Sequence, residues 1–178
     1  MAPHKHRACT NYARQWLWIL ACLSAWGLAA AALAQPASGS SPALPAARDL
    51  AADAQLLRAR QIPLMILYSR PDCSWCERAR REFLVPLVAD PAAAERVLVR
   101  QVDLDSAAPL TDFAGRITTH GAFAKARQVM HTPTLMFYDQ DGSQVASPIQ
   151  GFLLADYYGA IVERRIDEGL AQLREAKP

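Results

Sequence analysis

The sequence predicts an α/β domain in which helices flank a central mixed β-sheet. Three observations favour this class. Four runs of strand length alternate with segments of helical periodicity, Asp141-Gly142 separates the last two runs as a tight hairpin turn does, and an amphipathic helix ends the chain. The 178 residues suffice for one domain with an ordinary core.

The N-terminal segment has the pattern of an export signal. Three basic residues and no acid precede an apolar stretch over residues 16–30, and Ala32-Leu33-Ala34 provides the small residues of a signal-peptidase site. We therefore expect residues 1–34 to be a cleaved signal peptide. The alternative is an uncleaved anchor, because the apolar stretch is long enough to span a bilayer. Residues 19–22 match a lipoprotein cleavage box only poorly.

Export changes the charge balance of the chain. The whole sequence has 19 Lys and Arg residues against 17 Asp and Glu residues, and the signal removes only basic ones. The remaining chain is nearly neutral, which argues against a nucleic-acid or anionic-membrane partner. It would also face an oxidising compartment, where disulfide chemistry is common.

The next segments lead into the domain. Residues 35–45 are rich in Pro, Ala, Ser and Gly and are expected to form a flexible linker, so that the domain spans residues 46–178. An Ala-rich run over residues 46–60 predicts the first helix. The continuous apolar run over residues 64–68 predicts a strand that is buried on both faces of the sheet.

A second helix is expected from about Cys73, after a turn over residues 69–72. Its apolar residues recur at steps of three and four, and Pro86 is expected to bend or end it. The predicted buried stripe consists of Cys76, Ala79, Phe83 and Leu87.

The second half of the chain supplies three more strands and the last helix. Strands are predicted over residues 97–104, 134–138 and 143–149, the last two as an antiparallel hairpin. In the interval 106–128, Pro and Gly interrupt every periodicity, and we expect one or two short helices that include residues 122–128. The final helix is expected over residues 153–174. Its predicted buried stripe is Tyr157, Tyr158, Ile161, Val162, Ile166 and Leu170.

Cys73-Ser74-Trp75-Cys76 lies where a strand gives way to a helix. The other two cysteines, Cys9 and Cys22, belong to the predicted signal. An isolated pair at this spacing is a redox centre more often than a structural bridge. Backbone N–H groups and the helix dipole at the first turn favour a thiolate, so we expect the pKa of Cys73 to be lowered. Cys73 is then the attacking cysteine, and the more buried Cys76 resolves the mixed disulfide.

Several marks in sequence order resemble the thioredoxin-fold family. They are the Cys-x-x-Cys at a strand-to-helix junction, Thr132-Pro133 directly before a strand, the Asp141-Gly142 hairpin turn and Gly151 before the last helix. The resemblance covers roughly residues 46–174 and is greatest to exported bacterial thioredoxin-like thiol-disulfide oxidoreductases.

The resemblance implies a thioredoxin fold with a helical insertion, near residues 106–128, before the cis-proline loop. It also implies that the Thr132-Pro133 bond is cis, which would otherwise be an improbable state for one proline. Thr132 and Pro133 would lie beside the cysteines and bind an extended substrate segment. Trp75 would offer that substrate an exposed apolar surface.

Two positions depart from the family's pattern. Leu67 stands where thioredoxins have a buried acid that helps to deprotonate the resolving cysteine, and Asp72 stands where they have a tryptophan. Glu77, beside Cys76, is a candidate substitute for the missing acid. The uncharged Ser74-Trp75 pair does not determine whether the centre reduces or oxidises its substrates.

The leading hypothesis is a periplasmic thiol-disulfide oxidoreductase with no cofactor beyond the Cys73–Cys76 disulfide and no metal. We expect a monomeric reductant or general exchanger of protein thiols, and the resemblance implies a membrane thiol donor. One alternative is a module that holds copper(I) or zinc through Cys73, Cys76 and His131. Another is a binding protein in which the bridge is a permanent staple, although so short a loop gains little from one.

Overall fold

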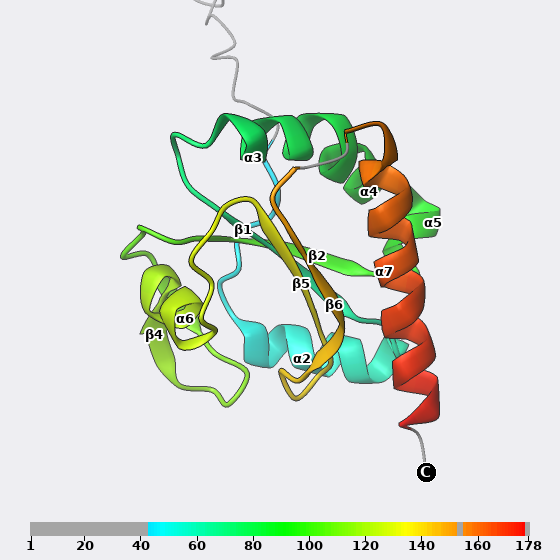
Figure 1. Ribbon diagram of the computed structural model, residues 1–178. Coiled ribbons are helices and arrows are strands. Elements are labelled where there is room, and N and C mark those ends of the chain that lie inside the picture. The colour runs from blue at the N-terminus through cyan, green and yellow to red at the C-terminus, as the bar shows by residue number, and fades with distance from the viewer. Residues whose placement is uncertain (1–42, 153–154, 177–178) are drawn as a thin grey trace, which may run out of the picture. The chain divides into compact units, whose positions relative to one another are not determined.

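The computed structural model describes residues 43–152 and 155–176, so the predicted signal peptide and most of the predicted linker lie outside the described residues. A four-stranded sheet forms the centre of the domain, with the strands in the order β2-β1-β5-β6 (Figure 1). β1 pairs in parallel with β2 and antiparallel with β5, and β5 pairs antiparallel with β6. The predicted mixed sheet is confirmed. The strands are β1 (Leu64–Ser69), β2 (Leu98–Asp103), β5 (Thr134–Tyr138) and β6 (Gln144–Gln150).

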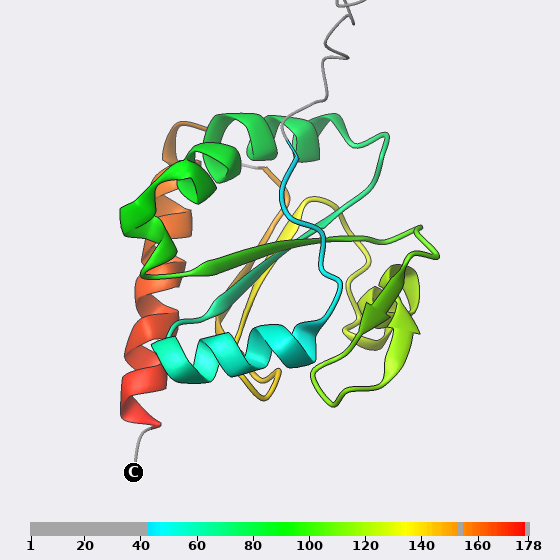
Figure 2. The same cartoon turned by 180° about the vertical axis from the view of Figure 1, so that it is seen from behind.

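Helices cover both faces of this sheet. In Figure 1, α3 (Ser74–Ala79) and α7 (Ala155–Glu175) lie above and to the right of the strands, whereas α2 (Leu50–Arg60) lies below them. Figure 2 shows the same layers from behind. Because side chains alternate along a strand, β1 sends Met65 and Leu67 into one core and Ile66 and Tyr68 into the other. Every residue of β1 is buried, as predicted for a strand covered on both faces.

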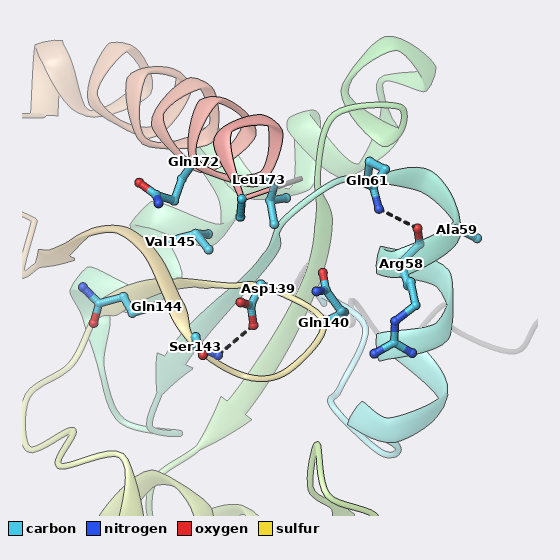
Figure 3. A pocket seen from close by; sticks show the side chains of 11 residues that line it. Arg58, Ala59, Gln61, Asp139, Gln140, Ser143, Gln144, Val145, Gln172 and Leu173 are labelled. Carbon is cyan, nitrogen blue, oxygen red and sulfur yellow. Dashed lines mark hydrogen bonds between the residues drawn. The ribbon is translucent and has the colours of Figure 1, made fainter. Parts of the chain in front are cut away.

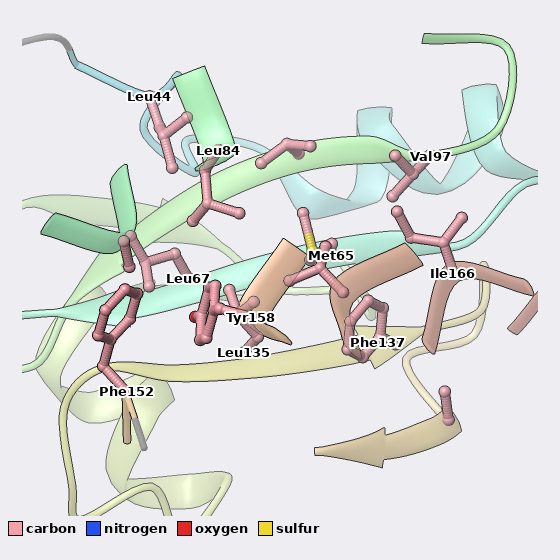
Figure 4. Packing of buried hydrophobic residues seen from close by; sticks show 14 residues of the cluster. Leu44, Met65, Leu67, Leu84, Val97, Leu135, Phe137, Phe152, Tyr158 and Ile166 are labelled. Carbon is pink, nitrogen blue, oxygen red and sulfur yellow. The ribbon is translucent and has the colours of Figure 1, made fainter. Parts of the chain in front are cut away.

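Figure 4 shows the core on the face of α3 and α7. Met65 and Leu67 of β1 and Phe137 of β5 pack there with Tyr158 and Ile166 of α7. The predicted stripe of the last helix is therefore largely correct. Tyr157 is the exception: its side chain is 64% exposed.

The chain enters the domain earlier than predicted. Leu44, which the sequence analysis placed in the linker, is buried in the core. The carbonyl of Pro45 accepts a hydrogen bond from Gln101 N–H (2.9 Å), and Ala47 N–H donates to the Gln101 carbonyl (2.8 Å). These residues thus add to the free edge of β2. The first helix begins only at Leu50, because Asp49 is extended and its carboxylate caps the helix by accepting from Ala52 N–H (2.9 Å).

The helix after the cysteine pair changes its hydrogen-bond pattern midway. It runs as α3 (Ser74–Ala79), a π-helical turn η1 (Arg80–Leu84) and α4 (Val85–Ala89), before the short α5 (Pro91–Ala94). Pro86 has no N–H group for an ordinary helical bond, and the wider turn precedes it. The extra residue per turn moves the stripe by one position, so that Leu84 is fully buried and Phe83 only partly.

The interval 106–128 contains one short helix, α6 (His120–Ala126), as the sequence predicted. A hairpin of β3 (Pro109–Thr111) and β4 (Ile117–Thr119), which the sequence did not predict, precedes it. The Asp112 carboxylate closes the hairpin turn by accepting from Arg116 N–H (2.9 Å), and Gly115 adopts the positive φ of 77° that the turn requires. No helix of the described residues is long and apolar enough to cross a membrane.

Candidate redox site

Cys73 and Cys76 form a disulfide at the start of α3, with their Cα atoms 5.2 Å apart. Cys73 is the N-cap residue: its backbone is extended, and its sulfur accepts a hydrogen bond from Cys76 N–H (3.1 Å). Cys76 is fully buried, whereas Cys73 is partly exposed. The structure therefore places the two sulfurs in the unequal environments that their positions in the sequence predict.

The cis-proline loop lies at the same end of the sheet as the disulfide. Tyr68 of β1 pairs with Thr134 of β5, so the residues before β5 lie level with the end of β1, four residues before Cys73. The Thr132–Pro133 peptide bond is cis, the isomer that the resemblance implied. Pro133 is buried and Thr132 is partly exposed. The Pro133 carbonyl accepts from Gly151 N–H (2.8 Å), which ties this loop to the end of β6.

Trp75, between the two cysteines, is the exposed end of an aromatic cluster. Its indole is 53% exposed and stacks on the buried ring of Phe152, with centroids 5.8 Å apart and an interplanar angle of 24°. Phe152 in turn contacts Tyr158 and Phe83, at centroid distances of 4.5 and 5.9 Å. Arg78 covers the Phe152 ring at 5.2 Å. Trp75 is thus held on one face and open on the other. The sequence analysis did not single out Phe152, whose one signal is its place directly after Gly151.

The charged residues near the motif are mostly paired with one another. Arg70, which could favour the Cys73 thiolate, lies 2.9 Å from the Asp105 carboxylate, and both side chains are more than a third exposed. Asp72 is exposed. Such surface charges have a weak effect on the sulfur because water screens them. The Cys76 N–H group, which donates a hydrogen bond to the Cys73 sulfur, acts on that sulfur more directly.

Leu67 is fully buried in the core beneath the helix. Because its side chain is apolar, this position offers no proton acceptor. Glu77 follows Cys76 on the helix, and its carboxylate accepts a hydrogen bond from the guanidinium of Arg80. Sequence reasoning did not single out Arg80, although its spacing of four residues from Cys76 places both on one side of the helix.

The metal alternative depends on Cys73, Cys76 and His131. Both sulfurs are consumed by the disulfide, and His131 is exposed. Within residues 43–152 and 155–176, no group of three or more His, Cys, Asp or Glu side chains could hold a metal ion. His120 is buried and has hydrogen-bond partners at both ring nitrogens.

A hollow of about 600 Å³ opens at the opposite end of the sheet (Figure 3). Polar side chains from the end of α2, the β5–β6 hairpin and the end of α7 line it, among them Arg58, Asp139 and Gln172. It shares no lining residue with the cysteine pair or the cis-proline loop, so it has no part in the chemistry of this site.

Comparison with known proteins gives one family match. Residues 50–166 match the model of a thioredoxin-like domain. No match was found among curated proteins.

Solved structures with a similar fold include an oxidoreductase described as DsbH, with a TM-score of 0.51 and 16% identity over 78% of this chain and 92% of that one. Mitochondrial thioredoxin 3 from Saccharomyces cerevisiae has a TM-score of 0.47 and 21% identity over 72% and 99%. The periplasmic thioredoxin SoxS from Paracoccus pantotrophus has a TM-score of 0.43 and 17% identity over 60% and 97%.

Proposed function

The chain belongs to the thioredoxin-like domain family, and from that membership we propose that it is an extracytoplasmic enzyme that exchanges its Cys73–Cys76 disulfide with protein substrates. Its enzyme class is thiol-disulfide oxidoreductase. The compartment, the direction of exchange and the roles of single residues are the substance of the proposal. The export pattern of residues 1–34 supports a periplasmic location.

The observation that carries the proposal is the bonded cysteine pair, with a backbone N–H directed at the outer sulfur. In the reduced protein the same amide and the first turn of the helix would stabilise a Cys73 thiolate. This thiolate attacks a substrate disulfide, and a mixed disulfide forms while one substrate thiolate leaves. Cys76 then attacks the sulfur of Cys73, which releases the second substrate thiolate and restores the bridge.

Protein substrates fit the surroundings of the pair. An extended substrate segment could pair with the backbone of Thr132, next to the buried Pro133, as an added strand. The open face of Trp75 would contact an apolar side chain of the same segment, because Phe152 holds the indole in place. We propose a monomer that needs no cofactor beyond its disulfide, acts as a reductant or general exchanger, and is reset by a membrane thiol donor.

Substitution of each cysteine tests the assignment of roles. Cys73→Ser is expected to abolish reduction of a model protein disulfide, because no attacking thiolate remains. Cys76→Ser is expected to stop at the mixed disulfide and to accumulate a covalent complex visible on a non-reducing gel. Exposed Ser74→Ala serves as the matched control and should retain turnover. Turnover by the Cys73→Ser variant would contradict the proposal.

The direction of exchange can be measured through the fluorescence of Trp75, the only tryptophan after residue 34. An equilibrium titration in glutathione or dithiothreitol buffers gives the reduction potential of the pair. For a reductant or general exchanger we expect a value between about −270 and −180 mV, the range from thioredoxin to disulfide isomerases. A value near −120 mV would instead indicate an oxidant, and a bridge that resists both buffers would indicate a staple.

A further inference from the structure

Arg80 is the centre of a polar network between the cysteine-bearing helix and the sheet. Its side chain is only 12% exposed. The guanidinium donates to the Glu77 carboxylate (2.5 Å), to the Ser69 hydroxyl (3.1 Å) and to the side-chain carbonyl of Gln101 (3.1 Å). Gln101 in turn donates to the Asp103 carboxylate (2.8 Å). We refer to these five residues as the Arg80 network.

The network lies on the side of the helix that carries the resolving cysteine. Arg80 follows Cys76 by four residues, and its N–H donates to the Cys76 carbonyl, so both side chains leave the same side of the helix. On the sheet, Gln101 of β2 pairs with Leu67 of β1 and shares its face. The polar groups are therefore one strand away from Leu67, the position that has the acid in the family's pattern.

Cys76 needs such a group because its thiol must lose a proton before it can attack. Burial in apolar surroundings disfavours a thiolate, and the fully buried Leu67 cannot accept a proton. The carboxyl group nearest to Cys76 along the helix is that of Glu77, the next residue. Arg80 binds one of its oxygens, Oε2, and the side chain is about a third exposed, so the other oxygen can exchange protons with water.

We propose that Glu77, positioned by Arg80, takes the proton of the Cys76 thiol when Cys76 resolves the mixed disulfide. In this step the thiol proton moves to the Glu77 carboxylate and the Cys76 sulfur bonds to the Cys73 sulfur. The bond between Cys73 and the substrate breaks, and the substrate leaves as a thiolate. The electrons balance because one disulfide replaces another, and Glu77 returns its proton to water or to the departing thiolate.

The charged groups around Glu77 come from the helix and from β2. Arg80 is its direct partner, and Asp103 approaches from β2 only through Gln101. The guanidinium of Arg78, which covers the Phe152 ring, binds Glu82 at 3.0 and 3.1 Å. The proposal rests on the exchange chemistry proposed above, and its test separates the two.

Stopped-flow reaction of the reduced protein with the aromatic disulfide 5,5′-dithiobis(2-nitrobenzoic acid) resolves the two steps. The first release of nitrothiobenzoate reports attack by Cys73, and the second reports resolution by Cys76. For Glu77→Gln we expect the second phase at pH 7 to slow by about tenfold or more, and its pH midpoint to rise, because general-base assistance is lost. The first phase should change by less than about twofold.

Three further variants separate proton transfer from structural damage. Arg80→Lys keeps the positive charge and should retain most of the second phase, whereas Arg80→Met should slow it as Glu77→Gln does. Asp53→Asn removes a carboxylate from the part-buried Arg100–Asp53 pair between α2 and β2, so it can lower stability but should leave the pH profile unchanged.

Two outcomes are then distinct. A second phase with the same rate and pH midpoint in wild type, Glu77→Gln and Arg80→Met would overturn the role of Glu77. The absence of any second phase in the wild-type protein would instead contradict the exchange chemistry itself.

Discussion

The His120 ring forms hydrogen bonds at the free edge of β2, where a residue of a further strand would otherwise form them. The N-terminal segment pairs with β2 through Pro45 and Ala47 and then turns away. At the next position along the edge, Nδ1 of His120 accepts a hydrogen bond from Asp103 N–H (3.1 Å), while Nε2 lies 2.7 Å from the Ala47 carbonyl. Because Nδ1 is the acceptor, the neutral ring carries its proton on Nε2 and donates it to Ala47.

Replacement of this ring by an apolar one has a calculable cost. His120→Leu removes two hydrogen bonds worth about 1 kcal/mol each, and it leaves the Ala47 carbonyl unpaired in a buried position at a further cost of about 1 kcal/mol or more. The ring is 3% exposed, so water does not compensate. We expect a loss of about 3 kcal/mol for His120→Leu, and about half of that for His120→Asn, whose side-chain oxygen can accept from Asp103 N–H as Nδ1 does.

Urea unfolding of the mature oxidised protein, followed through Trp75 fluorescence, measures these free energies. The matched control is His131→Leu, because His131 is exposed and should cost less than about 0.5 kcal/mol. If His120→Leu is as stable as the control variant, or if the Asn variant is no better than the Leu variant, the role assigned to the ring is wrong.

Three more substitutions test hydrogen bonding and packing elsewhere in the domain. Burial raises the pKa of Asp112, but the backbone and side-chain bonds from Arg116 outweigh it and hold that pKa below its ordinary value. The contribution of the ionised Asp112 carboxylate to the free energy of unfolding is therefore present above about pH 4, and it is lost as the pH falls through the pKa of the folded protein. Asp112→Asn should cost about 1–2 kcal/mol at pH 7 and progressively less in acid, as measured by urea unfolding across a pH series. Gly121→Ala places a Cβ 2.7 Å from the Leu104 carbonyl and should cost about 2 kcal/mol, whereas a gain in melting temperature, normal for this change in a helix, would show that the close approach does not exist. The Tyr158 hydroxyl is buried and has no hydrogen-bond partner among the described residues, so Tyr158→Phe should leave stability unchanged or raise it, and a loss above about 1 kcal/mol would reveal a partner.

Strong local patterns made much of the sheet predictable. The apolar run after Pro63 predicts β1 to within one residue, because a strand buried on both faces needs apolar side chains at every position. Asp141-Gly142 predicts the β5–β6 hairpin for an equally local reason, since Gly142 adopts a φ of 78° there. The last helix follows from its stripe, except that Tyr157 points to solvent despite its aromatic ring.

Features that depend on distant partners escaped prediction. β3 and β4 have three residues each, too few for an alternating pattern to emerge, and the hairpin owes its stability partly to Arg48, whose carbonyl accepts from Thr111 N–H (2.9 Å). Leu44 resembled a linker residue because only the folded sheet supplies the core into which it packs. Pro86 signalled a disturbed helix but not a π turn that moves the buried position to Leu84.

Some residues of the candidate site were predictable from the sequence and others were not, for the same reasons. Cys73, Cys76 and Trp75 form one continuous motif, and the motif itself predicts that they lie together. Phe152 is 77 residues from its stacking partner Trp75, and no local pattern joins them. Arg80 was not singled out from the sequence, because its partners Ser69 and Gln101 belong to two different strands.

The central claim is that the Cys73 sulfur ionises readily because a backbone amide is directed at it, while Cys76 does not. The rate of alkylation by iodoacetamide, measured for each cysteine of the reduced protein by mass spectrometry across a pH series, tests this most directly. We expect Cys73 to react first, with a midpoint well below the value of about 8.5 for a free thiol, and Cys76 to stay protected. Equal rates for both cysteines, with midpoints near that of a free thiol, would contradict the account.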